Sequence, residues 1–138
     1  MCPSLSLQSD NIKYLGIVVD RELRFEEHIL GVCGKLSAGC YAVRVAAQEL
    51  GVELGRSVYF SLIESHLRYG ICFWGNAAAY LIQMLFVLQK RAVRYICGAK
   101  PRDSCRPLFI KLGIHTVFSL YIQEVATVIF RNRFKFVT

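Results

Sequence analysis

The chain of 138 residues is long enough for one domain or part of a larger protein, and 54% of its residues are hydrophobic, which excludes an intrinsically disordered chain. Its 17 Lys and Arg residues against 10 Asp and Glu give a formal net charge of +7. That balance favours a polyanionic partner, either nucleic acid or an acidic membrane surface.

The first structural element is predicted at residues 12–19, a short apolar run that contains Gly16. Glycine weakens the interior of a strand, so its presence indicates a bulge, a bend, or a close approach of another molecule to the backbone. Residues 1–11 contain no basic segment followed by an apolar one, and no secretory signal is predicted there.

Helical periodicity follows and continues to the end of the chain. An apolar residue recurs every seven positions from Ile29 to Leu50, which predicts a helix over 25–49 that ends at Gly51. Further helices are predicted over 53–73, 79–97 and 104–112, and from Thr116 onward. Thr116 is a suitable N-cap, and the stripe of the last helix is predicted to be Phe118, Tyr121, Val125 and Ile129.

These elements predict a mainly α fold, in which a short N-terminal β-strand or hairpin is followed by an irregular bundle of four to five helices. Gly75 and Asn76 give the strongest turn signal and separate the second helix from the third. Trp74, just before this turn, is interpreted as a packing anchor, with base stacking as the alternative. The apolar surplus predicts an exposed hydrophobic patch.

Most of the net charge falls between residues 90 and 111, where Asp103 is the one acid. Three of these cations lie on the polar side of the third predicted helix and three in the segment that follows it: Lys90, Arg91, Arg94, Lys100, Arg102 and Arg106. A concentrated field of this kind attracts polyanions. The alternative, a solvated helix face with no ligand, remains open from the residues alone.

Cysteine and histidine give no sign of a metal centre. The six cysteines include no C-x-x-C pair, and reduced, mostly buried thiols are predicted, which favours an intracellular protein, nuclear or cytoplasmic. His28, His66 and His115 fall on different predicted elements. The three glutamates near His28 suit the first turn of a helix, where negative charge is favoured. No metal site, catalytic residue or small-molecule substrate is predicted.

A membrane-spanning segment is a further alternative. Residues 69–89 carry no charged side chain, and 21 residues are enough to cross a bilayer. The Gly75-Asn76 break would leave backbone groups unsatisfied in lipid, so two buried helices joined by a turn fit better, and membrane association is the least favoured interpretation.

Six blocks, in order, resemble the region that follows the palm in the reverse transcriptases of non-LTR retrotransposons, the jockey-like elements in particular. They cover roughly residues 12–130. The blocks are K-Y-L-G-I-V-V-D-R-E-L-R-F-E-E-H-I at 13–29, K-L-S-A-G-C-Y-A-V-R at 35–44, S-H-L-R-Y-G-I-C-F-W-G at 65–75, L-Q-K-R-A-V-R-Y-I-C-G at 88–98, S-C-R-P-L-F at 104–109 and S-L-Y-I-Q-E at 119–124.

The resemblance implies that Lys13, Tyr14, Leu15 and Gly16 form a primer grip, with Gly16 allowing close approach of a sugar-phosphate backbone and Lys13 adding a phosphate contact. It implies that the helices form a thumb, which holds an RNA–DNA or RNA template–primer duplex by its backbone. Such a grip is largely independent of sequence. The domain organisation expected is an unmatched segment over 1–11, the primer-grip and thumb-like region over 12–130, and a truncated tail over 131–138.

The family's catalytic carboxylates have no counterpart here. Polymerase chemistry needs carboxylates that hold two metal ions, and the family supplies them from an Asp and an Asp-Asp pair in the palm. This chain has only Asp10, Asp20 and Asp103, none adjacent to another. The chain alone is therefore predicted to be inactive, with magnesium bound by a missing palm that would be its protein partner. The alternative function is a non-catalytic helical interaction module.

Overall fold

The computed structural model describes residues 11–135 and begins with an antiparallel hairpin. Strand β1 (Asn11–Tyr14) pairs with β2 (Ile17–Asp20), with Tyr14 opposite Ile17. Leu15 and Gly16 form the two-residue turn with φ of 51° and 86°. Positive φ at both central residues defines a type I′ turn, whose twist suits a hairpin. Gly16 therefore lies in a turn, and the strand-bulge interpretation is wrong.

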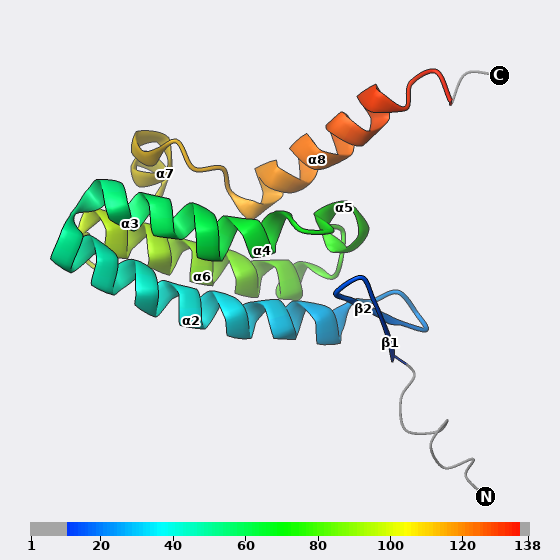
Figure 1. Cartoon of the computed structure of the whole chain (residues 1–138), viewed down its shortest axis with the longest axis horizontal. Helices are drawn as coiled ribbons and strands as arrows, with labels where there is room; N and C mark the ends of the chain where they lie inside the picture. Colours follow the sequence, from blue (N-terminus) through cyan, green and yellow to red (C-terminus); the bar gives the residue numbers. More distant parts are fainter. Residues whose placement is uncertain (1–10, 136–138) are drawn as a thin grey trace, which may run out of the picture.

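Three helical rods lie side by side and form the body of the molecule (Figure 1). The first is α2 (Glu26–Leu50), the second runs continuously through α3 (Val52–Tyr59), the π-helix η1 (Phe60–Glu64) and α4 (Ser65–Arg68), and the third is α6 (Ala79–Cys97). The core lies between them. With α5, α7 and α8, the described residues contain six helical stretches, which confirms the mainly α fold with an N-terminal hairpin.

The predicted stripe of α2 is buried except at its last position. Ile29, Leu36 and Val43 are fully buried, whereas Leu50 is 65% exposed at the end of the rod. Gly51, with φ of 97°, ends the helix as predicted. Before the helix, the Asp20 carboxylate accepts hydrogen bonds from the backbone N–H groups of Arg24 and Phe25 at 2.8 and 2.6 Å, which fixes the path from the hairpin into α2.

The helix predicted over 53–73 differs from the structure in two places. It widens into a π-helix over Phe60–Glu64 and stops at Arg68, because Tyr69 is extended and Gly70 is left-handed, with φ of 69°. A Cβ on Gly70 would lie 2.4 Å from Cδ1 of Ile17. The hairpin thus packs where only glycine leaves room, and the chain turns there into the short helix α5 (Ile71–Trp74).

The turn predicted at Gly75 and Asn76 is confirmed, and it separates α5 from α6. Trp74 is fully buried and its indole Nε1 donates to the Tyr69 carbonyl at 3.0 Å, which confirms the packing anchor rather than a base-stacking platform. Because of this break, residues 69–89 do not form one continuous helix.

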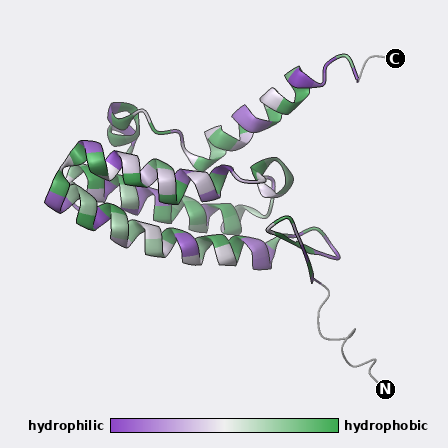
Figure 2. Cartoon of the chain, in the orientation of Figure 1, coloured by the Kyte–Doolittle hydropathy of each residue, from purple (hydrophilic) through white to green (hydrophobic). Residues whose placement is uncertain are grey.

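The last two helices are α7 (Arg106–Leu112) and α8 (Val117–Arg131). Thr116 caps α8 as predicted, with its hydroxyl accepting from the Ser119 N–H at 3.2 Å. Only the first turns of α8 lie against the bundle, and the helix then projects away from it (Figure 1). Hydrophobic segments recur along α8 out to its far end (Figure 2).

The predicted stripe of α8 is correct only in part. Val117 and Leu120 face the bundle and are buried, and Tyr121 of the predicted stripe also packs against the core. Phe118, Ile122 and Ile129 are 43%, 68% and 55% exposed and form an outward apolar face. The reason is a tertiary contact: the Val117 N–H donates to the buried Gln89 side chain, which sets the rotation of the helix. This outward face supplies part of the exposed hydrophobic surface that the composition predicts.

Candidate nucleic-acid interface

The hairpin turn presents the four residues of the predicted primer grip at one end of the bundle. Lys13, Tyr14, Leu15 and Gly16 are all exposed. The turn is held from below by Tyr69, whose hydroxyl donates to the Leu15 carbonyl. A Cβ at Gly16 would lie 3.5 Å from the Tyr69 ring, so one side of the turn is occupied and the other faces solvent.

Two hollows flank this turn. An apolar groove of about 500 Å³ separates the hairpin from α5, and its lining includes Leu15, Ile17 and Phe73. On the other side, a hollow of about 200 Å³ is bordered by Gly16, Lys35 and His66. The hairpin end of the molecule therefore combines an apolar cleft with a smaller one that carries basic and polar side chains.

The second group of predicted residues lies on α6, in the loop after it, and at the start of α7. On α6, Lys90, Arg91 and Arg94 fall within about 100° of one another around the helix axis, because each residue turns the helix by about 100°. Arg91, Lys100, Arg102 and Arg106 are exposed, whereas Lys90 and Arg94 are half-buried.

Arg94 has a structural role in the loop. Its Nε and Nη2 donate to the Asp103 carbonyl at 3.3 and 3.1 Å, and the Asp103 carboxylate accepts from the Lys100 N–H at 2.8 Å. Gly98 caps α6 in a left-handed conformation. The one acid of this segment is thus engaged with loop backbone, and its neighbours Lys100 and Arg102 remain exposed around it.

The charge of this region is more one-sided than the segment 90–111 alone indicates. From residue 65 to residue 123 the chain has eight Lys and Arg residues and a single acid, Asp103. Within residues 11–135, no carboxylate lies at ion-pair distance from Arg91, Lys100 or Arg102. A positive field with no adjacent negative charge attracts a phosphate backbone.

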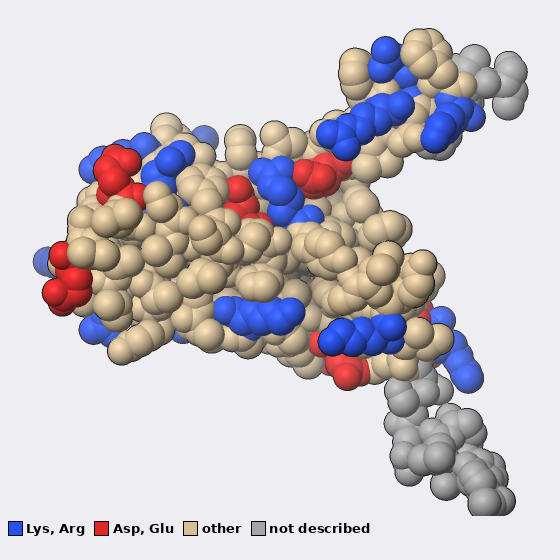
Figure 3. All heavy atoms as spheres, in the orientation of Figure 1, with Lys and Arg blue, Asp and Glu red and all other residues tan. Residues whose placement is uncertain are grey.

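The two groups of predicted residues are not brought together. The hairpin lies at the end of the bundle where α2 and α6 begin. The basic loop follows the opposite end of α6 (Figure 1). The 19 residues of α6 span roughly 28 Å at about 1.5 Å per residue. In the view of Figure 3 the middle of the molecule is largely uncharged, and other Lys and Arg side chains gather at the projecting end of α8.

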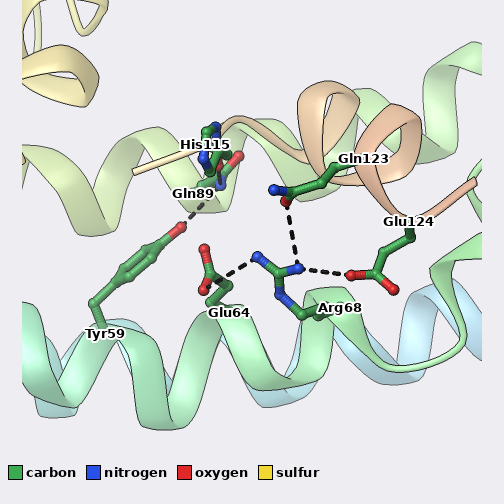
Figure 4. Close-up of polar contacts among 7 residues, drawn as sticks. All are labelled: Tyr59, Glu64, Arg68, Gln89, His115, Gln123 and Glu124. Atoms are coloured by element: carbon green, nitrogen blue, oxygen red, sulfur yellow. Dashed lines mark hydrogen bonds and ion pairs between the residues drawn. The ribbon is translucent and has the colours of Figure 1, made fainter. Parts of the chain in front are cut away.

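A buried polar cluster that the sequence did not reveal fixes the basic helix to its neighbours (Figure 4). Gln89 is fully buried; its Nε2 donates to the Tyr59 hydroxyl at 2.8 Å and to the His115 carbonyl at 2.7 Å. Its Oε1 accepts from the Val117 N–H at 2.9 Å. Burial raises the pKa of Tyr59 well above its ordinary value, so this hydroxyl stays neutral. One amide therefore joins α3, α6, the segment before α8, and α8 itself.

An ion cluster nearby joins α8 to the second rod. Glu64 and Arg68, one helical turn apart in the second rod, form an ion pair at 3.7 Å, and Arg68 also contacts Glu124 of α8 at 2.6 Å (Figure 4). The Gln123 side chain accepts from the same guanidinium at 3.4 Å. The base of α8 is thus held by both a buried amide and a partly exposed ion cluster.

His28 is the one buried side chain of the described residues with a polar atom left unpaired. Its Nδ1 accepts from the Val18 N–H at 3.3 Å, and its Nε2 has no partner. The ring lies 5.8 Å from that of Trp74. Burial, reinforced by the charge of Lys35, lowers the pKa of His28.

Residues 11–135 contain no group of three or more His, Cys, Asp or Glu side chains that could hold a metal ion. The five cysteines of this range are free thiols, and burial raises the pKa of Cys33, Cys40 and Cys97. Cys2, Asp10 and Phe136 lie outside the described residues.

By length and composition, α2 could cross a membrane, and the bent pair of α7 and α8 could do so if it formed one span. In this fold 39% of the most apolar segment of α2 is buried against the rest of the chain.

Comparison with known proteins gives a consistent set of relatives, all from Drosophila melanogaster. The chain is 30% identical to the RNA-directed DNA polymerase from mobile element jockey, over 90% of this chain and 15% of that protein. It is 26% identical to the probable RNA-directed DNA polymerase from transposon X-element, over 80% of this chain and 13% of that protein. The probable polymerase from transposon BS is 29% identical over 80% of this chain and 12% of that protein.

These similarities support a relationship to the reverse transcriptases of non-LTR retrotransposons. The chain spans about one-eighth to one-seventh of the length of the curated relatives it matches. No protein-family model matches it, and no solved structure matches it significantly. The similarity covers 80–90% of the chain and therefore includes most of the helical bundle.

Proposed function

We propose that this chain is a thumb-like part of a retrotransposon reverse transcriptase, which binds a template–primer duplex of RNA and DNA and contributes no catalytic residue. The observation that carries this proposal is the coincidence of sequence similarity to three mobile-element polymerases with an acid-poor basic surface. That surface comprises Arg91, Lys100, Arg102 and Arg106, all exposed. We call it the α6–α7 basic surface.

Its chemistry suits a nucleic-acid backbone. Phosphate contacts by Lys and Arg give affinity without reading sequence, which a polymerase requires along its whole template. The α6–α7 basic surface and the hairpin turn are separated by roughly 28 Å, the length of α6. One turn of B-form DNA extends about 34 Å, so a duplex of about one turn lying along the bundle is long enough to reach both ends.

In this proposal the hairpin contacts the end of the primer. Lys13 and the backbone of Leu15 and Gly16 are exposed and sit on a turn fixed by Tyr69. The absence of a side chain at Gly16, one of the two turn residues, lets a sugar-phosphate chain approach the backbone closely there. Arg94, which braces the loop through Asp103, positions Lys100 and Arg102 rather than acting as a principal contact.

The proposed protein partner is the palm of the parent polymerase, which would also supply the magnesium-binding carboxylates. The apolar groove beside the hairpin, with Phe73 64% exposed, is the surface proposed for it. The chain spans at most 15% of the relatives' length. In this proposal the palm belongs to the remaining part of such a polymerase.

The proposal is tested by the affinity of the chain for a blunt RNA–DNA hybrid, measured by fluorescence anisotropy. Replacing Arg91, Lys100 and Arg102 with Gln removes three phosphate contacts and is expected to weaken binding at least tenfold at about 0.1 M salt. A matched control replaces Arg131, Arg133 and Lys135 of the α8 end with Gln. Equal losses in both triple variants would reduce the effect to net charge and contradict the proposal.

A second candidate, a helical interaction module, is favoured by one specific observation. Phe118, Ile122 and Ile129 form an apolar face on a helix that leaves the bundle. If the wild-type chain binds no hybrid and Ile122→Asp changes its self-association, the interaction module becomes the better account.

A further inference from the structure

A groove on the opposite end of the molecule from the hairpin is open, large and free of acidic residues. It has a volume of about 690 Å³ and lies between α6, α7, the segment 113–116 and the first turn of α8. This volume falls within the range of about 300–1,000 Å³ that small-molecule sites occupy. We call it the α7 groove.

The floor of the α7 groove is apolar and aromatic. Phe86 and Phe109 line it, with ring centroids 6.0 Å apart. Ile110 of α7 lines the groove and is 75% exposed. An exposed isoleucine beside an aromatic floor leaves apolar surface that a planar ligand can cover.

The rim of the same groove is basic. Lys90 and Arg106 line it, and none of the lining side chains is acidic. The Lys90 ammonium lies over the Phe86 ring, 4.7 Å from its centroid, so a cation is already held on the aromatic floor. Within residues 11–135, no carboxylate is placed to neutralise Lys90 or Arg106. His115, Thr116 and Ser119 add polar groups at the side of α8.

An aromatic floor with a cationic rim is the combination that binds unpaired nucleotides, with the base on the apolar surface and the phosphate at the cations. In a duplex the bases are paired and stacked, so they do not reach the floor of a concave groove. We propose that the α7 groove binds the unpaired part of a nucleic-acid strand, at the margin of the duplex held by the α6–α7 basic surface. This inference rests on the proposed function and adds to it a selectivity for single strands.

Arg106 belongs to both surfaces in this account. It is exposed at the first position of α7, between the loop that carries Lys100 and Arg102 and the groove that Lys90 borders. The one acid of this segment, Asp103, accepts a hydrogen bond from the Lys100 N–H in the loop, and the groove itself has no acidic lining residue. The strand contacts the groove through base and phosphate together, whereas the duplex contacts the basic surface through phosphate alone.

The discriminating variant is Ile110→Asp in the full chain. Ile110 is exposed, so the substitution is compatible with folding, yet it places a negative charge and removes apolar surface inside the groove. The probes are a fluorescein-labelled oligouridylate of 12 nucleotides and a blunt RNA–DNA hybrid. The control is Val45→Asp, which makes the same charge change at a partly exposed site on α2.

The wild-type chain is expected to bind the oligouridylate, and Ile110→Asp to weaken that binding roughly tenfold or more, the scale of a lost base contact. The same variant should change hybrid affinity less than threefold, and Val45→Asp should change neither. Arg106→Ala should weaken both probes, because Arg106 borders both surfaces. If Ile110→Asp lowers the melting temperature, Lys90→Gln tests the groove instead, because Lys90 lines the groove and is not part of the α6–α7 basic surface; it should weaken oligouridylate binding more than hybrid binding.

Each other outcome has a definite meaning. If the wild-type chain binds the hybrid but not the oligouridylate, the groove inference is wrong and the proposed function stands. If Ile110→Asp and Val45→Asp weaken both probes equally, the effect is long-range charge and the inference is again wrong. If the wild-type chain binds neither probe, both proposals fail and the groove is better regarded as a protein-binding surface.

Discussion

Replacing Gln89 with Met tests whether one buried amide holds the second half of the fold in place. The substitution keeps the length of the side chain but removes its donor and acceptor. It leaves three groups without their partner: the Tyr59 hydroxyl, the His115 carbonyl and the Val117 N–H.

The magnitude follows from which of these groups water can reach. A buried polar group left unpaired costs about 1–3 kcal/mol. Tyr59 and Val117 are buried, whereas His115 is exposed, so its carbonyl regains a partner from solvent at little cost. Two unpaired groups, partly offset by the better packing of the thioether, give a loss of about 3 kcal/mol. That is a large fraction of the roughly 5–15 kcal/mol that stabilise a domain.

Urea unfolding followed by circular dichroism measures this loss, and Gln89→Glu sharpens the test. The carboxylate still accepts from the Val117 N–H, but its other oxygen faces the His115 carbonyl. Burial and this carbonyl favour the protonated acid, so the folded-state pKa rises above the unfolded value of about 4.3. The folded state then binds more protons, and stability relative to wild type recovers as pH falls from 7.5 toward 4.5. A Gln89→Met variant within 1 kcal/mol of wild type would refute the reasoning.

The other predictions concern the hairpin end and the base of α8. Because burial lowers the pKa of His28, the unfolded state binds the proton first, and stability should fall as pH drops below about 6.5. His28→Phe should reduce this dependence of stability on pH. An unchanged dependence would mean that another group causes it. Gly70→Ala should destabilise the chain by about 1–3 kcal/mol in urea, through a left-handed φ and the clash with Ile17, and Trp74 fluorescence should shift with it. Glu124→Gln should cost about 0.5–1 kcal/mol, diminishing at high salt, because the Arg68 pair is only partly buried; a salt-independent loss would contradict the ionic explanation.

The fold was largely predictable because the residues that begin and end its helices act locally. Gly51 and the Gly75–Asn76 break act on the residues next to them, and Thr116 caps α8 within one turn. The limits of α6, predicted as 79–97, coincide with Ala79–Cys97 for the same reason. What sequence reasoning missed depends on tertiary contacts: the break at Gly70 follows from the position of Ile17, 53 residues earlier in the chain.

The same distinction applies to the candidate site. The basic segment is visible in the sequence because its charges are contiguous, and its exposure follows from its position on a helix end and a loop. The role of Gln89 was not predictable, because a single glutamine in an apolar helix gives no sign of its three partners. The α7 groove also requires the fold, since it is formed by residues from Phe86 to Ser119 on four segments.

The salt dependence of binding to a blunt RNA–DNA hybrid tests the central claim most directly. If Arg91, Lys100, Arg102 and Arg106 each contact one phosphate, a plot of log affinity against log salt concentration should have a slope near −4, because each contact contributes about −0.9. The triple variant with Gln at the first three positions should have a slope near −1. A wild-type slope close to zero, or one that the triple variant leaves unchanged, would contradict the account.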